Sequence, residues 1–270
     1  MDMDIWLTVL FWSLIGSIVS MTAGALLLTK KISLQYVQLI AVPFAAGALL
    51  VASFGNLLPE AFAQADGERI GVVVLASFVV FFVLERFLGW FHHHHEHRGG
   101  EKFHPTVGLL VVGDIVHNAI DGLVIGAAFL IDVPTGIVVT LAVAAHEIPQ
   151  ELGDFGLMLA LGLKRAKVLV VNLVSALATV VAALFVVAWG DSLSYAEPYL
   201  LAVAAGFFIY IAAADLIPTI HAEGHTKTAN IQTLVLLVAI VLVGLTIETA
   251  HRYIEGDEHA ATPAVVAGVE

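Results

Sequence analysis

Residues 114–121 read Asp-Ile-Val-His-Asn-Ala-Ile-Asp, and residues 146–154 read His-Glu-Ile-Pro-Gln-Glu-Leu-Gly-Asp. Both stretches lie inside apolar runs that are long enough to cross a bilayer, which takes about 20 apolar residues. An ionisable side chain in hydrocarbon costs about 3 kcal/mol or more, and such residues in membrane helices usually mark functional sites. These two stretches therefore predict a membrane protein with a polar centre.

The composition supports a membrane protein and limits the metal chemistry. Hydrophobic residues make up 60% of the 270 residues and charged residues 13%, whereas a soluble domain has about 25% charged residues. The chain has no cysteine, which excludes disulfides and thiolate metal sites. Histidine, carboxylate and amide ligands remain, and they suit zinc, iron and manganese. With a formal charge of -12, we expect no nucleic-acid partner.

The apolar runs predict an all-α polytopic membrane protein with eight transmembrane helices. The expected spans are 5–29, 35–63, 69–91, 106–131, 135–161, 166–189, 196–220 and 229–252. Short connections join them, so residues 1–254 form a single transmembrane domain. A His-rich loop at 92–105 and a flexible tail at 255–270 complete the prediction.

The basic residues predict an orientation, because Lys and Arg are retained on the cytoplasmic side of a membrane. With eight spans, nine of the eleven basic residues fall on one side, namely Lys30, Lys31, Arg86, Arg98, Lys102, Lys164, Arg165, Lys167 and Lys227. Only Arg69 and Arg252 fall on the other side. We therefore expect both termini outside and the His-rich loop inside, in a prokaryotic plasma membrane.

An internal repeat relates the second and seventh predicted spans. Ala45-Ala46-Gly47 is followed after eight residues by Asn56-Leu57-Leu58-Pro59, and Ala204-Ala205-Gly206 is followed after eight residues by Asp215-Leu216-Ile217-Pro218. The two spans run in opposite directions through the membrane in the predicted topology. The spacing thus predicts inverted repeats, helices 1–3 and 6–8, around a central pair of helices 4 and 5, an arrangement typical of alternating-access carriers.

The polar residues of spans four and five fall on helical stripes, because residues three and four apart share a face. The stripes are Asp114, His117 and Asp121 with Asn118 beside them; His146, Gln150 and Asp154; and Glu147, Glu151 and Asp154. The core of neither span contains Lys or Arg. A metal ion or protons must therefore compensate the carboxylates.

Small residues and one proline accompany these stripes. Gly122, Gly126, Gly153 and Gly156 are small enough to let helices approach closely. Pro149 has no backbone N–H and frees the carbonyl of Ala145, which predicts a bend beside the polar residues.

Residues 117–122 and 146–155 resemble the paired fourth- and fifth-helix motifs of the ZIP family (zinc- and iron-regulated transporter-like proteins), most closely the branch with HNxxDG and HEIPHELGDF. Residues 56–61 and 206–211 are similar to the same branch. The resemblance implies transport of zinc, or of iron, manganese or cadmium, into the cytoplasm by an elevator-type, alternating-access movement. It leaves open whether one or two adjacent ions bind and whether the protein is a homodimer.

By position, the resemblance implies six metal ligands: His117, Asn118, Asp121, His146, Glu147 and Gln150. Glu151, Asp114 and Asp154 are candidates for the outer shell or the pathway, and His92, His93, His94, His95 and His97 for a cytoplasmic metal-receiving loop. Gln150 departs from the branch, which has histidine there, and span six offers only Asn172, Ser175 and Thr179 where some members supply a carboxylate.

Two other functions compete with import. A metal exporter or channel could use the same ligands. An intramembrane metalloprotease is suggested by His146-Glu147, but its motif needs a second histidine at position 150, where this chain has glutamine. We therefore expect no enzymatic activity, and metal ions and membrane lipid as partners.

Overall fold

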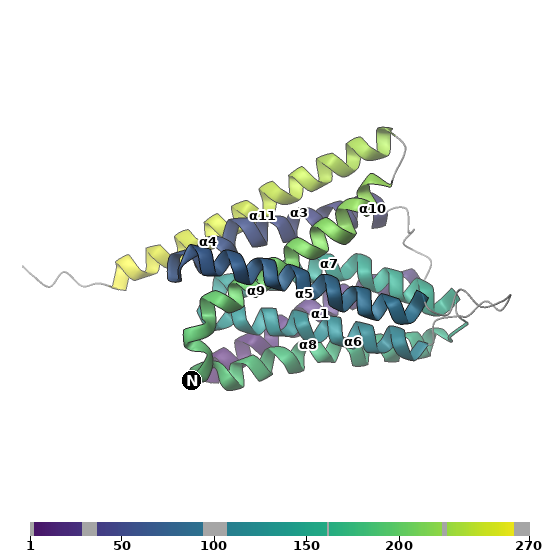
Figure 1. Ribbon diagram of the computed structural model, residues 1–270, viewed down its shortest axis with the longest axis horizontal. Helices are drawn as coiled ribbons and strands as arrows, with labels where there is room; N and C mark the ends of the chain where they lie inside the picture. The colour runs from purple at the N-terminus through teal and green to yellow at the C-terminus, as the bar shows by residue number, and fades with distance from the viewer. Residues whose placement is uncertain (1–2, 29–36, 94–106, 161, 223–225, 262–270) are drawn as a thin grey trace, which may run out of the picture.

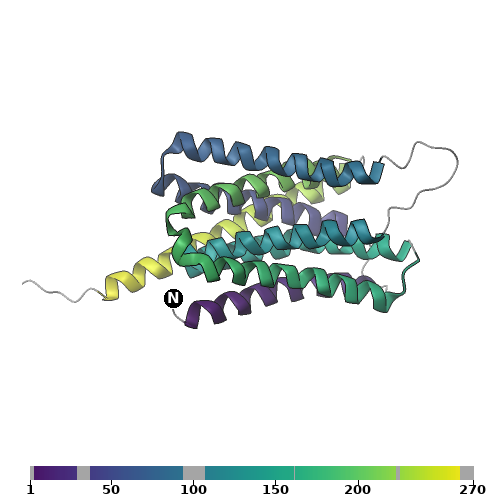
Figure 2. The ribbon, with the colours of Figure 1, turned by 60° about the horizontal axis from the view of Figure 1, so that its bottom comes forward.

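A computed structural model describes residues 3–28, 37–93, 107–160, 162–222 and 226–261. Every regular element in these ranges is helical (Figures 1 and 2). The elements are α1 Met3–Leu28, η1 Val37–Ala41, α3 Val42–Ala52, η2 Ser53–Leu57, α4 Leu58–Gln64, α5 Gly67–His93, α6 Val107–Ile131, α7 Val133–Ala160, α8 Arg165–Leu193, η3 Ser194–Ala196, α9 Glu197–Tyr210, η4 Ile211–Leu216, α10 Ile217–His221 and α11 Thr226–Ala261.

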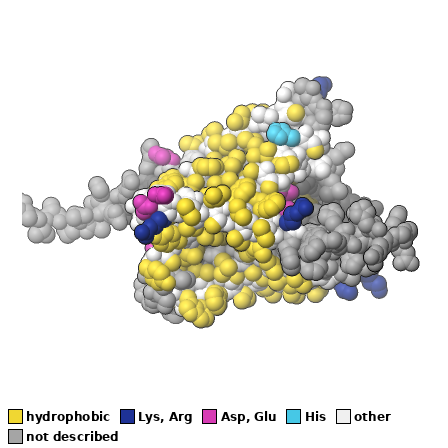
Figure 3. All heavy atoms as spheres, viewed as in Figure 1, with side chains coloured by type: hydrophobic (Ala, Val, Ile, Leu, Met, Phe, Trp, Pro, Cys, Tyr) yellow, Lys and Arg dark blue, Asp and Glu magenta, His cyan; other side chains and the backbone are white. Residues whose placement is uncertain are grey.

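The helices have the length and surface of membrane spans, and the predicted all-α polytopic class is confirmed. Seven segments are long and apolar enough to cross a bilayer. Figure 3 shows hydrophobic side chains over most of one face, with charged side chains toward its two ends. α7 is not among the seven, because its polar residues lower its mean hydropathy, so the count of eight stays a prediction. The boundary at residue 254 also stays a prediction, and α11 continues past it to Ala261.

The helices pack as two groups. In the first group, α1, α6, α7 and α8 pack against one another, with the most extensive contact between α6 and α8. In the second group, α3 packs on α11, and α5 packs on α9. The groups meet where α3 contacts α7 and where α6 contacts α9.

Glycines permit the closest of these crossings. A methyl group on Gly126 would lie 2.7 Å from the Ala183 carbonyl oxygen of α8, and Gly122 is in still closer contact with Thr179 of the same helix. Gly47 approaches α11, and Gly206 approaches α5, equally closely. The expectation that glycine allows a close helix approach was wrong for Gly153 and Gly156. A methyl group added to either would meet nothing within 4 Å. These two positions face open space, so they do not let helices approach.

Both copies of the internal repeat contain a π-helical turn at the same place. In η2 the Leu58 N–H donates to the Ser53 carbonyl, and in η4 the Ile217 N–H donates to the Ala212 carbonyl. Each turn is followed, after one residue, by a proline, Pro59 or Pro218, which has no N–H to continue the α-helical hydrogen-bond ladder. π-Helical turns widen a helix by one residue and often occur at functional sites. Here η4 carries Asp215.

Candidate metal centre

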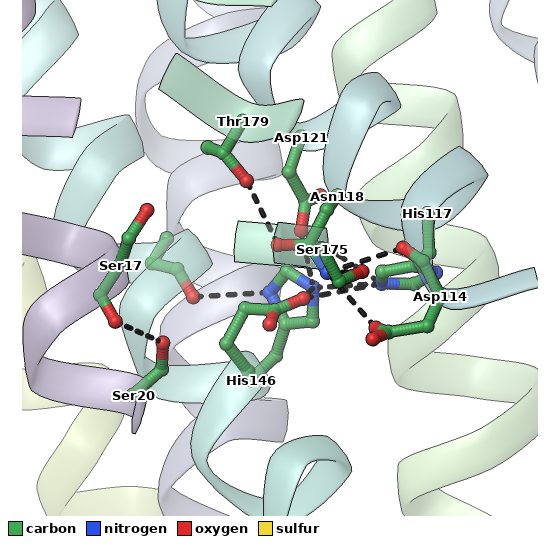
Figure 4. A network of polar contacts seen from close by, with 11 residues as sticks. Ser17, Ser20, Asp114, His117, Asn118, Asp121, His146, Ser175 and Thr179 are labelled. Atoms are coloured by element: carbon green, nitrogen blue, oxygen red, sulfur yellow. Dashed lines mark hydrogen bonds and ion pairs between the residues drawn. The ribbon is translucent and has the colours of Figure 1, made fainter. Parts of the chain in front are cut away.

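Four side chains from α6 and α7 converge at the centre of the molecule (Figure 4 labels His117, Asp121 and His146). The Nε2 atom of His146 lies 3.3 Å from the Nε2 atom of His117 and 3.3 Å from Oδ2 of Asp121. His117 Nε2 lies 3.8 Å from Asp121 Oδ2 and 3.6 Å from Glu147 Oε1. One ligand atom from each of these residues lies within 4.8 Å of all the others. Their arrangement is compact enough for one ion.

The spacing of the four atoms can be compared with that of a metal polyhedron. The bonds from tetrahedral zinc to nitrogen and oxygen are about 2.0–2.1 Å long. In a tetrahedron, bonds of this length place neighbouring ligand atoms about 3.3–3.4 Å apart. Five of the six separations are 3.3, 3.3, 3.6, 3.8 and 3.9 Å, so they begin at this value and exceed it by about 0.6 Å at most, and the sixth, between Asp121 and Glu147, is within 4.8 Å. A small inward adjustment would therefore complete a cage for a divalent cation.

Helix periodicity and one backbone carbonyl orient the two histidines. His117 and Asp121 are four residues apart, so they lie one turn apart on the same face of α6. His146 Nδ1 lies 3.4 Å from the Ala142 carbonyl oxygen. An Nδ1–H donated to that carbonyl leaves the Nε2 lone pair facing the cluster, the usual arrangement of a metal-binding histidine. Pro149 lies within α7, which runs uninterrupted from Val133 to Ala160.

The cluster contains buried oxygen atoms that have no hydrogen-bond partner. Asp121 is fully buried, and Glu147 is nearly so. Both carboxylate oxygens of Asp121 and Oε1 of Glu147 accept no hydrogen bond. In the described residues no Lys or Arg forms an ion pair with them. Buried carboxylates without a partner are costly, and a divalent cation bound between these side chains would compensate their charge.

Asn118 lies beside the cluster with its carboxamide turned toward α8. Its Nδ2 donates to Asp114 Oδ1 at 2.9 Å, and its Oδ1 accepts from the Thr179 hydroxyl at 2.9 Å. A longer contact of 3.5 Å joins Nδ2 to the Ser175 hydroxyl. The structure therefore places this predicted ligand in a network that links α6 to α8, with both ends of its amide engaged.

The remaining predicted residues are distributed around the cluster. Gln150, Asp114 and Asp154 line a cavity of about 660 Å³ that also reaches His117 and His146. Glu151 is buried, outside that lining, and neither of its carboxylate oxygens has a partner. Of the His-rich segment, His92 and His93 end α5, whereas His94, His95 and His97 lie outside the described residues.

The cavity extends from the cluster toward one end of the helices. Its lining includes Phe207, which is buried, and also Thr219 near the end of the seventh span and Gln38 at the start of the second, which are more exposed. These helix ends adjoin the segments where the sequence places most of its Lys and Arg residues.

The sequence prediction missed three polar residues on the opposite wall of this cavity, Glu85, Tyr210 and Asp215. Asp215 had been noted only as part of the internal repeat. A signal for the two acids was present, because each is a carboxylate inside a predicted apolar span. Tyr210 lies within the 206–211 stretch that resembles the family branch, but nothing in the sequence distinguished it from its apolar neighbours.

Comparison with known proteins identifies a family for the chain. Residues 92–248 match the profile of the family described as ZIP Zinc transporter. "Zinc transporter foi" of Drosophila melanogaster is 37% identical over 127 residues, which are 47% of this chain and 18% of that protein. "Zinc transporter ZIP4" of Homo sapiens is 44% identical over 110 residues, 41% of this chain and 17% of that protein. The chain thus matches less than a fifth of the length of these relatives.

Proposed function

The chain belongs to the ZIP zinc transporter family, and on that premise we propose that it transports divalent metal cations across a membrane. The observation that carries the proposal is the cluster of His117, Asp121, His146 and Glu147, whose ligand atoms have nearly the spacing of a tetrahedral zinc site. In this proposal the four side chains bind the cation while it crosses. The cation is the cargo, and zinc is the preferred ion because two imidazoles and two carboxylates suit it.

Two predicted ligands have different roles in this proposal. Gln150 lies on the cavity wall beside His146 and supplies an amide oxygen to the ion on its way out or to a second, adjacent ion. Asn118 holds α6 against α8 through Thr179 and Asp114. The Asn118 network fixes the turn of α6 that carries His117 and Asp121.

The cation crosses by alternating access in our proposal. Support comes from the division of the helices into two groups, because α6 and α7, which hold the cluster, belong to one group and pack on the other mainly through α3 and α9. The paired π-helical turns and the matching pairs α3–α11 and α5–α9 support an inverted repeat as its structural basis. An elevator-type shift of the first group would open the cluster to the opposite side.

The proposed direction of transport is based on where the cavity extends and on where the basic residues lie. The cavity extends toward the helix ends that carry most of the Lys and Arg residues, and basic residues are retained in the cytoplasm. We propose that this conformation faces inward and that the cation is released there. Import into the cytoplasm across a prokaryotic plasma membrane is the resulting function.

Uptake of zinc, cadmium, iron and manganese into proteoliposomes tests the proposal. His117→Ala and His146→Ala should each abolish uptake, whereas His221→Ala, which changes an exposed histidine on α10, should not. Retained uptake in both cluster variants would remove the site.

A counterflow measurement separates a carrier from a channel. Labelled zinc should enter proteoliposomes loaded with unlabelled zinc faster than it enters empty ones. The reason is that the binding site of a carrier returns to the outward-facing state faster when it holds an ion. Equal rates from loaded and empty vesicles would favour a channel.

A further inference from the structure

The two histidines of the cluster are held in position in different ways. His146 is almost fully buried, and its Nδ1 atom lies 3.4 Å from the Ala142 carbonyl oxygen of its own helix. The His117 side chain is 25% exposed. Within the described part of the chain, the polar contacts of His117 are all made by Nε2, the atom that faces the cluster. No polar group of those residues therefore fixes the His117 ring through Nδ1.

A phenylalanine from the other helix group supplies this support. Phe207 is 1% exposed, and its ring meets the His117 ring edge to face, with the centroids 5.7 Å apart and the planes at 62°. Aromatic rings attract each other in this arrangement at centroid distances of about 4.5–7 Å. His117 belongs to α6, in the first group, whereas Phe207 belongs to α9, in the second. The orientation of one ligand thus depends on a residue outside the helices that carry the cluster.

Phe207 is itself fixed within the second group. Its ring stacks on the Phe81 ring of α5 at a centroid distance of 4.0 Å. The backbone next to it is also constrained, because a methyl group on Gly206 would lie 2.6 Å from the Val74 carbonyl oxygen. A buried ring with these neighbours has little freedom to turn aside. It therefore limits the rotation of the His117 ring.

The cavity shows what this restraint does for the metal. Phe81 and Phe207 line it together with His117 and His146, so water in the cavity reaches the cluster beside the aromatic pair. Rotation of His117 away from the cluster would let water molecules take its place on the ion. Zinc is bound well by four ligands in a tetrahedron, whereas manganese prefers an octahedron of oxygen ligands. A fixed His117 ring therefore favours zinc.

We propose that Phe207 is a positioning residue that sets the metal preference of the histidine cluster. It holds the His117 ring toward the ion, keeps the site four-coordinate and so favours zinc over manganese. The inference rests on the proposed transport function and adds the basis of its selectivity. Phe207 supplies no ligand atom, and its effect on the ion is transmitted through His117.

Cobalt binding to the full-length chain purified in detergent tests this role. Co²⁺ is the probe because its visible absorption is strong in a tetrahedral site and weak in an octahedral one. The native chain should give the strong spectrum. His117→Ala supplies the reference spectrum of a site that lacks this ligand.

Phe207→Leu keeps all four ligands but removes the ring that restrains His117. Its Co²⁺ absorption should fall most of the way toward that of His117→Ala, and its zinc affinity, measured by competition with Co²⁺, should fall about tenfold. Phe81→Leu removes the ring on which Phe207 stacks, so it should reduce the absorption in the same direction by a smaller amount. Circular dichroism confirms that each variant keeps its helices.

Phe129→Leu is the matched control. Phe129 is 2% exposed on α6, beyond Asp121, and its ring lies against Gly136 of α7. The control therefore also removes a buried ring, but one without contact to either histidine. It should leave the Co²⁺ spectrum and the zinc affinity unchanged.

Uptake into proteoliposomes measures the preference directly. With zinc and manganese in competition, Phe207→Leu should lower the zinc-to-manganese uptake ratio about tenfold, and Phe129→Leu should not change it. An unchanged Co²⁺ spectrum or an unchanged uptake ratio in Phe207→Leu would overturn the proposal. So would a weak spectrum in the native chain, or equal losses in Phe207→Leu and Phe129→Leu.

Phe81→Leu decides in the same way if Phe207→Leu does not fold, since a native spectrum in that variant would overturn the proposal. None of these results would affect the proposed transport function. That function fails only if the native chain moves no metal or if the histidine variants still do.

Discussion

His117 Nε2 and His146 Nε2 lie 3.3 Å apart, although the two residues belong to different helices and are separated by 29 positions in the sequence. Two neutral imidazoles at this distance either share a proton or turn their lone pairs toward a common cation. Asp121 Oδ2 lies as close to His146 as His117 does. The relationship between the two histidines is therefore the geometric basis of the proposed cation site.

Removing one charge from the cluster should weaken metal binding but stabilise the metal-free protein. Asp121 is fully buried, with both oxygens unpartnered, so Asp121→Asn should raise the stability of the metal-free form by about 1–3 kcal/mol. Zinc should also raise the melting temperature of this variant by less than it raises that of the native chain. Thermal unfolding in detergent with and without zinc measures both effects. A metal-free variant less stable than the native chain would contradict the assignment of Asp121 as an uncompensated ligand.

The contact between α6 and α8 should depend on Gly122. Gly122→Ala would place a methyl group against the Thr179 carbonyl and the Ala182 side chain, and overpacking of this kind costs about 1–3 kcal/mol. Gly153→Ala is the matched control, because its methyl group would meet nothing within 4 Å and alanine favours a helix by about 1 kcal/mol. Equal melting temperatures for the two variants would show that the crossing is looser than the structure indicates.

Thr179 should influence metal affinity without touching the ion. Thr179→Ala removes the hydroxyl that donates to Asn118 Oδ1, which should loosen the turn of α6 that carries His117 and Asp121. We expect zinc affinity to fall by about tenfold, as for other residues that hold a ligand in place. Thr233→Ala, at an exposed threonine bonded to the Ala229 carbonyl, is the control. Isothermal titration with zinc measures the effect, and equal affinities for the two variants would argue against the network.

Gln150 should set part of the metal preference. It lines the cavity beside His146, and Gln150→His would replace a neutral amide with an imidazole, which zinc binds more strongly. Competition between zinc and manganese for uptake should then shift about tenfold toward zinc. Gln64→His, at an exposed position on α4, controls for an added histidine. An unchanged zinc-to-manganese ratio would place Gln150 outside the ion's path.

The sequence could predict the partners within each helix. His117 and Asp121 share a face of α6 because they are four residues apart, and the apolar runs gave the helical class. The sequence could not predict that Asn118 turns to α8. The partner of a side chain on another helix depends on how the two helices pack, and helical periodicity does not specify that packing. The sequence also could not show that Glu85 and Tyr210 face the cluster, because they lie on helices whose register is set by the close packing of Gly206 against α5.

By itself, then, the sequence determined the membrane location, the helices and the set of candidate metal ligands, because hydrophobicity and helical periodicity act over one or two turns of chain. The tertiary structure alone decided which of the predicted ligands meet in one cluster, namely His117, Asp121, His146 and Glu147, and that Glu85, Tyr210 and Asp215 line the same cavity as the two histidines. Small residues at the crossings fix how far each helix slides and turns against its neighbours. Those contacts join segments far apart in the chain, so no local pattern records them.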